Sequence, residues 1–330
     1  GRWGGRAIRR TVCALGLLVL WTFMGIYLPD STVETPFWRA VLAPGVALRT
    51  SKPVVDYHEE VAKAEAAGIE VTAVFPPVPY DYAKTRPREG QLSPDWFFKE
   101  TQHDRGAVGK HPLGTNTGGK DVFSTLLYGT RISMTIGVIA VAIYVTIGIV
   151  LGALAGYFGG WVDMVISRLI EIFICFPFLF FILTLVAVFE TRSIFLIMAA
   201  IGVIAWPGVA RLVRGEFLTQ RTQDYVVAAR ALGIPQRRVI FRHVLPNSLT
   251  PVLVSATFGV AAAILVESGI AFLGLGDPSA ASWGMLMDKG RQNHLQWMIL
   301  PPGFAIFFTV TAFNLLGEGL RDALDPKLRQ

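Results

Sequence analysis

Long apolar stretches alternate with polar segments along most of this chain. Six of the stretches are long enough to cross a bilayer, which takes about 20 consecutive, mostly apolar residues. They cover approximately residues 10–28, 131–156, 163–188, 193–212, 249–275 and 297–319. A spanning helix satisfies its backbone hydrogen bonds internally, so the pattern predicts an all-α membrane protein with six transmembrane helices.

The polar segments between these stretches predict how the chain is organised. We expect an N-terminus with the first span, a small extracytoplasmic insert that ends in a short interfacial helix, a five-helix core and a tail. These parts correspond to residues 1–28, 29–130, 131–320 and 321–330. The core includes a polar loop at 215–247. No small-x-small cleavage site follows the first span, so we expect it to stay in place rather than be removed as a signal peptide.

Basic residues are concentrated at three places. One group precedes the first span, a second lies between the fourth and fifth spans, and a third follows the sixth. The groups are Arg2, Arg6, Arg9 and Arg10; Arg211, Arg214, Arg221, Arg230, Arg237, Arg238 and Arg242; and Arg321, Lys327 and Arg329. With six spans all three groups fall on one side, which the positive-inside rule identifies as cytoplasmic. The sequence therefore predicts a multi-pass protein of the inner membrane with both termini in the cytoplasm.

Composition agrees with a membrane-embedded chain and narrows its chemistry. Hydrophobic residues make up 52% of the 330 residues and charged residues 16%, which is typical of a membrane protein. The net charge of +6 then reflects topology rather than nucleic-acid binding. Cys13 and Cys175 lie in predicted spans and are expected to be apolar fillers. We see no nucleophile–base signature and no metal-ligand cluster, so we expect this chain to hold no catalytic site, metal or cofactor.

The polar loop between the fourth and fifth spans has the most informative pattern. It reads DYVVAARALGIPQRRVIFRHVLPN and predicts two short helices around a glycine hinge. The first begins at Asp224 and ends at Leu232, because Gly233 suits the left-handed position that follows a helix. Pro235 fits the first turn of the second helix, which we expect to end near Leu245–Pro246.

Small and basic side chains suggest that this loop meets a partner on one side of the membrane. Two adjacent alanines leave one face smooth enough for a close approach, and four arginines make the segment cationic. These residues are Ala228, Ala229, Arg230, Arg237, Arg238 and Arg242. The alternative is a basic cytoplasmic loop that only sets the topology.

The loop resembles the EAA loop of the membrane subunits of ABC importers. That motif reads Glu-Ala-Ala, three residues, Gly, nine residues and Ile-x-Leu-Pro. Five positions match at this spacing: Ala228, Ala229, Gly233, Leu245 and Pro246. The glutamate is replaced by Val227 and the isoleucine by His243. The resemblance implies that the loop seats in a cleft on an ATPase subunit, with the matching residues and Asp224, Arg230, Arg237 and Arg238 as coupling residues.

Two further stretches resemble the dipeptide, oligopeptide and nickel permeases among these importers. One begins at His111 and reads HPLGTNTGGKD, with Asn116 and Lys120 in place of an aspartate and an arginine. The other, FLGLGDPSAASWGMLM, covers 272–287. The similarities together cover roughly residues 111–330. The chain is therefore similar to the second, C-type permease chain of an oligopeptide importer.

This resemblance implies the fold of a type I ABC importer permease and a set of partners. They are a second permease chain in a heterodimer, two cytoplasmic ATPase subunits that bind ATP and Mg²⁺, an extracytoplasmic substrate-binding protein, a peptide substrate and membrane lipid. Nickel or a modified peptide is an alternative substrate. Alternatives from other classes are an ion-coupled secondary transporter and a membrane scaffold or receptor whose outer segment binds a ligand. Peptide length and the residues that contact substrate are left open.

Ionisable and small residues inside the predicted spans are the remaining candidates, since charges in a membrane are costly and often functional. Arg168 and Glu171 lie three residues apart and are expected to face each other, as pathway lining or as a structural ion pair. Glu267 is a candidate for the pathway or for a contact with another chain. Pro177 and Pro207 are expected to kink the third and fourth spans. Close helix packing is predicted for a row of small residues: Gly148, Gly152, Gly156 and Gly160.

Overall fold

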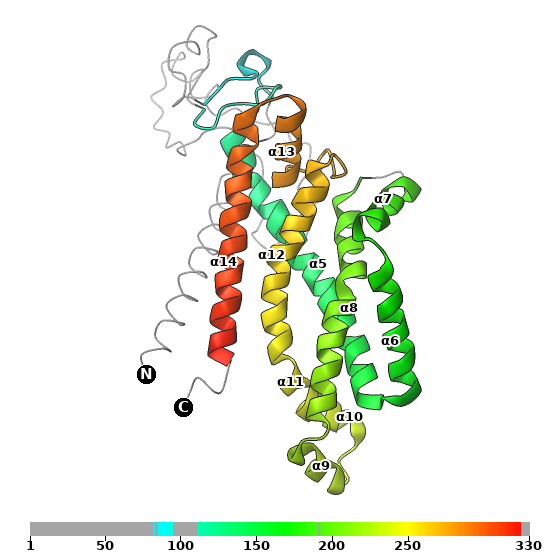
Figure 1. Cartoon of the computed structure of the whole chain (residues 1–330). Coiled ribbons are helices and arrows are strands. Elements are labelled where there is room, and N and C mark those ends of the chain that lie inside the picture. Colours follow the sequence, from blue (N-terminus) through cyan, green and yellow to red (C-terminus); the bar gives the residue numbers. More distant parts are fainter. Residues whose placement is uncertain (1–81, 83–84, 95–110, 190–191, 325–330) are drawn as a thin grey trace, which may run out of the picture. The chain divides into compact units, whose positions relative to one another are not determined.

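The computed structural model describes residues 82, 85–94, 111–189 and 192–324 (Figure 1). Among these residues the regular secondary structure is helical, apart from one isolated bridge between Thr115 and Asp121. The all-α fold predicted from the hydrophobic pattern is therefore confirmed. The first predicted span, residues 10–28, and most of the predicted insert lie outside the described residues.

Among the described residues, four helices are long and apolar enough to cross a membrane. They are α5 (Val122–Phe158), α8 (Ile194–Gln220), α12 (Thr250–Phe272) and α14 (Leu300–Leu324), the last together with the short 3₁₀ helix before it, η4 (Gln296–Met298). A fifth candidate is a helix pair, α6 (Gly160–Cys175) and α7 (Phe178–Phe189), which is bent by 83°. These five correspond to the second to sixth spans that the sequence predicts.

The bend between α6 and α7 follows from Pro177. The residue before it, Phe176, has an extended backbone with φ −79° and ψ 121°, which is the conformation that a following proline ring imposes by steric clash. The predicted kink in this span is thus a complete break. Pro207, in contrast, lies inside α8, which continues as one helix on both sides of it.

Helix α5 is longer than the span predicted from the sequence. It has 37 residues, which corresponds to about 55 Å, whereas the hydrocarbon core of a bilayer is about 30 Å thick. The boundary expected at residue 130 therefore falls inside this helix, and the expected short interfacial helix is its first part. Gly129 does not end the helix; a Cβ atom there would lie 2.6 Å from the carbonyl oxygen of Ala281, so its small size permits a close approach.

The described residues belong to two compact units. The first contains residues 136–189, 192–267 and 308–324, and the second contains residues 82, 85–94, 111–135 and 268–307. In the first unit, α8 packs against both α6 and α7. The second unit includes the short helices η1 (Pro87–Glu89) and α13 (Trp283–Gln292). The indole of Trp283 is buried there and its Nε1 donates to the carbonyl oxygen of Leu126 at 3.0 Å.

A row of glycines lets α5 and α8 approach closely in the first unit. Cβ atoms added to Gly148, Gly152 and Gly156 would lie 2.5–2.6 Å from atoms of α8, which is closer than non-bonded carbon atoms pack. The predicted packing row is confirmed for these three glycines. Gly160 does not belong to it, because it begins α6 after the chain has turned. Its φ is +55°, and no described residue has an atom within 4 Å of an added Cβ.

Candidate functional site

The polar loop between α8 and α12 forms a series of short helices (Figure 1). They are α9 (Asp224–Ala231), α10 (Gln236–Arg238), the π-helical η3 (Val239–Val244) and α11 (Leu245–Ser248). Gly233 follows α9 with φ +73°. The N–H groups of residues 232–234 donate to carbonyl oxygens of α9 at 2.9–3.2 Å, which is the pattern that ends a helix at a left-handed glycine. The predicted glycine hinge is confirmed.

The second half of the loop extends further than the sequence predicts. Helical turns continue past Leu245–Pro246 and end at Ser248. Pro246 does not stop them, because it lies in the first turn of α11, where its missing N–H leaves no bond unmade. Only Leu249 then separates α11 from Thr250, the first residue of α12. The loop is therefore joined to α12 almost without a break.

Apolar side chains hold the loop together from inside. Val226, Val239 and Val244 are fully buried, and Ala229 is also buried. This corrects the expected smooth face, because only Ala228 of the alanine pair is exposed. Ala229 packs within the chain since it lies three residues after Val226 and so on the same face of α9. Its small side chain therefore serves the internal packing of the loop.

The outer surface of the loop combines exposed apolar and cationic side chains. Leu232 is 82% exposed, Phe241 66% and Val227 54%. The predicted coupling residues Asp224, Arg230, Arg237, Arg238 and Pro246 are exposed as well, and Leu245 is half-buried. Exposed apolar side chains that gather into a patch rimmed by polar residues mark an interaction site. We use the term loop surface for all exposed side chains among residues 224–247.

Two residues that the sequence analysis missed fasten the ends of the loop. The Tyr225 hydroxyl donates to Gln220 Oε1 at 2.7 Å. Asn247 Nδ2 donates to the Tyr225 hydroxyl at 3.2 Å and to the carbonyl oxygen of His243 at 2.9 Å. These bonds connect the beginning of α9 with α11. No sequence pattern links Tyr225 and Asn247, because they are brought together only when the loop folds.

An ion pair that the sequence does not reveal joins α6 to α8 in the first unit. The Arg214 guanidinium donates to both carboxylate oxygens of Asp163, through Nε to Oδ1 and through Nη2 to Oδ2 at 2.7 Å. This two-pronged geometry is the strongest form of an arginine–carboxylate contact. The two residues are 51 positions apart, so spacing alone could not pair them.

The structure gives different surroundings to the three ionisable candidates in the spans. Arg168 and Glu171 face each other as expected, with Nη1 and Oε2 2.6 Å apart, but both side chains are largely exposed. Glu267 is buried within the chain. The first unit also contains an apolar cavity of about 570 Å³, lined from α5, α6, α7, α8 and α12. None of the three ionisable side chains is among its lining residues.

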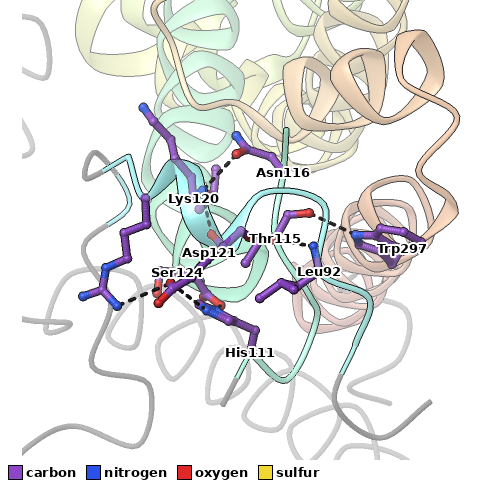
Figure 2. Close-up of polar contacts among 11 residues, drawn as sticks. Leu92, His111, Thr115, Asn116, Lys120, Asp121, Ser124 and Trp297 are labelled. Carbon is purple, nitrogen blue, oxygen red and sulfur yellow. Dashed lines mark hydrogen bonds and ion pairs between the residues drawn. The ribbon is translucent and has the colours of Figure 1, made fainter. Parts of the chain in front are cut away.

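The second recognisable motif folds into a buried polar cluster in the second unit, which we call the histidine cluster (Figure 2). His111 lies between two carboxylates: Nδ1 is 2.9 Å from Asp121 Oδ1, and Nε2 is 3.2 Å from Glu89 Oε2. All three side chains are at least 95% buried. Both ring nitrogens of His111 therefore have a carboxylate oxygen within hydrogen-bond distance. Arg86 Nη1 lies 3.5 Å from the same Glu89 oxygen.

Other residues of this motif organise the backbone around the cluster (Figure 2). Asp121 Oδ2 accepts from the Ser124 N–H at 2.7 Å, so the aspartate also caps the start of α5. The Thr115 hydroxyl donates to the Glu89 carbonyl oxygen at 2.5 Å and accepts from the Leu92 N–H at 2.8 Å. The motif is thus structural, since its hydrogen bonds connect residues 85–94 to the beginning of α5. The sequence analysis missed Glu89, since it lies outside the motif.

Comparison with known proteins finds a matching family and several similar permeases. Residues 148–330 match the family described as "Binding-protein-dependent transport system inner membrane component". Similar proteins include the oligopeptide transport system permease protein OppC of Haemophilus influenzae, 42% identical over 71% of this chain and 79% of that protein. The dipeptide transport system permease protein DppC of Alkalihalophilus pseudofirmus is 40% identical, over 68% and 75% respectively.

A third relative and a solved structure extend the comparison. The glutathione transport system permease protein GsiD of Pectobacterium atrosepticum is 36% identical over 71% of this chain and 78% of that protein. The fold also resembles a chain of the inward-facing methionine ABC transporter MetNI, with a TM-score of 0.50 and 16% identity over 61% of this chain and 96% of that one. At this identity the structural likeness concerns the fold alone.

Proposed function

The chain belongs to the family of inner-membrane components of binding-protein-dependent transport systems, and from this we propose that it forms half of the translocation pathway of an ATP-driven peptide importer. It is a multi-pass membrane protein and a transport subunit of the permease type. The observation that supports the substrate class is the set of similar permeases, which are named for oligopeptides, dipeptides and glutathione. All of these substrates are peptides.

The assembly that we propose contains more than this chain. A second permease chain would complete the pathway as a heterodimer, and two cytoplasmic ATPase subunits would bind ATP and Mg²⁺. A substrate-binding protein on the other side of the membrane would deliver the peptide. The three groups of basic residues support an orientation with both termini and the loop surface in the cytoplasm.

The loop surface is the proposed contact with the ATPase subunits. Its exposed Leu232 and Phe241 offer apolar anchors of the kind that dominate protein interfaces, and the surrounding arginines offer charge complementarity. The helical loop follows α8 after three residues, 221–223, and is separated from α12 by Leu249 alone. A movement that an ATPase imposes on the loop would therefore be passed to both helices, because neither connection is long enough to absorb it.

The mechanism that we propose is alternating access. ATP binding draws the two ATPase subunits together, and the loop acts as a lever that moves α8 and α12. The pathway then opens toward the binding protein and accepts the peptide, and ATP hydrolysis resets it. This chain contributes leverage and half of the pathway, while the chemistry of hydrolysis belongs to the ATPase subunits.

Purification and reconstitution test this proposal. The tagged chain is isolated from its native membranes in mild detergent, and the proteins that accompany it are identified by mass spectrometry. We expect a second permease, ATPase subunits and a binding protein, and ATP-dependent uptake of labelled peptides after reconstitution into vesicles. Uptake by the chain alone, driven by an ion gradient, would contradict the proposal and favour a secondary transporter.

A variant of the loop surface tests the ATPase contact in the same experiment. Leu232→Asp places a charge on the most exposed apolar side chain of the loop, so it should leave membrane insertion unchanged and weaken recruitment of the ATPase. Unchanged recruitment would show that the ATPase binds elsewhere.

A further inference from the structure

Three arginines connect the loop and α8 to the corner between α5 and α6. This corner comprises residues 156–163, from the last turn of α5 through Gly159 to the first turn of α6, and we call it the α5–α6 corner. One of the three, Arg214, forms the ion pair with Asp163 described above. The other two, Arg221 and Arg230, reach the end of α5, and all of these residues lie in the first unit.

Arg230 lies over an aromatic ring of α5. Its guanidinium carbon is 5.4 Å from the centroid of the Tyr157 ring, which is within the range of a cation–π interaction. The Tyr157 side chain is buried, and its hydroxyl has no hydrogen-bond partner among the described residues. The ring face, rather than the hydroxyl, is therefore what the loop contacts.

Arg221 binds the backbone at the same place. Its Nη1 lies within hydrogen-bond distance of two carbonyl oxygens of α5, at 3.2 Å from Gly156 and 3.5 Å from Tyr157. The last carbonyl groups of a helix have no partner within the helix and bear a partial negative charge, so a cation there is favourable. Arg221 immediately follows α8, which means that it connects the entrance of the loop to the end of α5.

We propose that Arg230 and Arg221 clamp the α5–α6 corner to the loop, so that movement of the loop is passed to α5 and α6 as well as to α8 and α12. This inference rests on the proposed function, because it assumes that the loop is driven by an ATPase. It assigns Arg230 a positioning role inside the chain, in place of the ATPase contact that its place in the sequence motif predicts.

A difference between the arginines of the loop supports this assignment. The side chains of Arg237 and Arg238 are exposed and make no hydrogen bond or ion pair with the described part of the chain. They are available to a partner. Arg230 already has a partner within the chain, and the glycines of α5 hold the same helix against α8 nearby. The arginine contacts at the end of α5 therefore add to the packing of α5 against α8.

The test uses the reconstituted importer and two separate measurements: affinity for the ATPase subunits, and peptide taken up per ATP hydrolysed. Arg230→Gln should lower uptake per ATP by about two- to five-fold, the size expected from the loss of one exposed cation–π contact, and leave ATPase affinity unchanged. Arg237→Gln should lower the affinity for the ATPase subunits and leave uptake per ATP hydrolysed unchanged. Tyr157→Phe keeps the ring face and removes only the unpartnered hydroxyl, so it should behave like the unchanged protein, whereas Tyr157→Leu should match Arg230→Gln.

The double variant makes the test specific. If the contact is the cause, Arg230→Gln combined with Tyr157→Leu should be no worse than either single change, because both remove the same interaction. Additive losses, or a loss of ATPase affinity in Arg230→Gln equal to that in Arg237→Gln, would overturn the clamp and make Arg230 an ATPase contact. A failure of the unchanged chain to bind any ATPase would instead overturn the proposed function, and the clamp with it.

Discussion

The hinge residue Gly233 is the single position on which the shape of the loop depends most directly. Its φ of +73° costs an L-amino acid about 1–2 kcal/mol, while no atom of the described residues lies within 4 Å of an added Cβ. The backbone conformation of Gly233, rather than a lack of space around it, therefore disfavours a side chain at this position. We expect Gly233→Val to distort the hinge and to lower peptide uptake per ATP hydrolysed, with normal membrane insertion. Uptake and hydrolysis are measured together in vesicles.

Asparagine provides the control for this prediction. It tolerates the left-handed region better than other non-glycine residues, so Gly233→Asn should retain most of the coupling. If both variants lose coupling equally, a side chain at this position disturbs the loop surface, and the backbone argument is wrong.

The histidine cluster yields a second prediction at the scale of residues. His111→Ala leaves the buried carboxylates of Glu89 and Asp121 without the ring between them, and a buried polar group that loses its hydrogen-bond partner typically costs about 1–3 kcal/mol. We expect a lower unfolding temperature of the chain in detergent. Thermal unfolding monitored by tryptophan fluorescence measures this.

The exposed His294 allows a matched comparison. Its φ is +56°, so His294→Asn preserves the backbone preference while removing an imidazole from the surface. This variant should unfold at the same temperature as the unchanged chain. If His111→Ala also unfolded at the same temperature as the unchanged chain, the histidine cluster would not stabilise the protein.

Contact between helices can be tested at the row of glycines in α5. A Cβ at Gly152 would lie 2.5 Å from the carbonyl oxygen of Ala210. Gly152→Leu should therefore separate α5 from α8 and cost about 1–3 kcal/mol, as overpacking usually does. Thermal unfolding in detergent measures the loss. Gly215→Ala on α8 is the control, because no atom in the described part of the chain lies within 4 Å of its added Cβ. It should be neutral or slightly stabilising, and a similar loss in both variants would contradict the packing argument.

Elements that depend on local sequence could be predicted, and those that depend on packing could not. Apolar length was sufficient for the second to sixth spans, and Gly233 was sufficient for the end of α9. The boundary expected at residue 130 falls inside α5, because nothing at Gly129 breaks this helix. Ala229 was assigned to the outer face of α9, although it is buried in a loop where α9 packs against the later helix η3.

The candidate sites show the same division. The spacing of Arg168 and Glu171 was enough to pair them, since both lie on one helix. The pairs Asp163–Arg214 and Tyr157–Arg230 join residues on different helices, and neither spacing nor residue type indicates such a partner in advance. His111 and Asp121 were visible as parts of a motif, but the motif does not say that its function is to bind Glu89 and to cap α5.

Orientation of the whole molecule leads to a labelling prediction. If the basic groups lie in the cytoplasm, the loop surface does too. In a chain whose native Cys13 and Cys175 are replaced by alanine, Leu232→Cys should react with a membrane-impermeant maleimide only after the cells are opened. Reaction in intact cells would reverse the proposed topology and exclude the loop as an ATPase contact.

Assembly with an ATPase should depend on two forces that respond differently to salt. Contacts of Arg237 and Arg238 with a negatively charged partner are screened, since the Debye length falls from about 10 Å at 0.1 M salt to about 3 Å at 1 M. Contacts of Leu232 and Phe241 are apolar and are not screened in this way. We therefore expect the affinity for the ATPase to fall with salt but to persist at high salt. Titrating the purified ATPase against the chain at increasing salt concentrations measures both parts.

Variants of the loop surface separate the two forces. Changing Arg237 and Arg238 to Gln should flatten the salt dependence and leave the high-salt affinity in place, because only the screened part is removed. Leu232→Asp should lower the affinity at every salt concentration. An affinity that does not change with salt in the unchanged chain would mean that the arginines lie outside the interface. The loop would then be held by its apolar side chains alone, and the positive charges of Arg237 and Arg238 would serve only the topology.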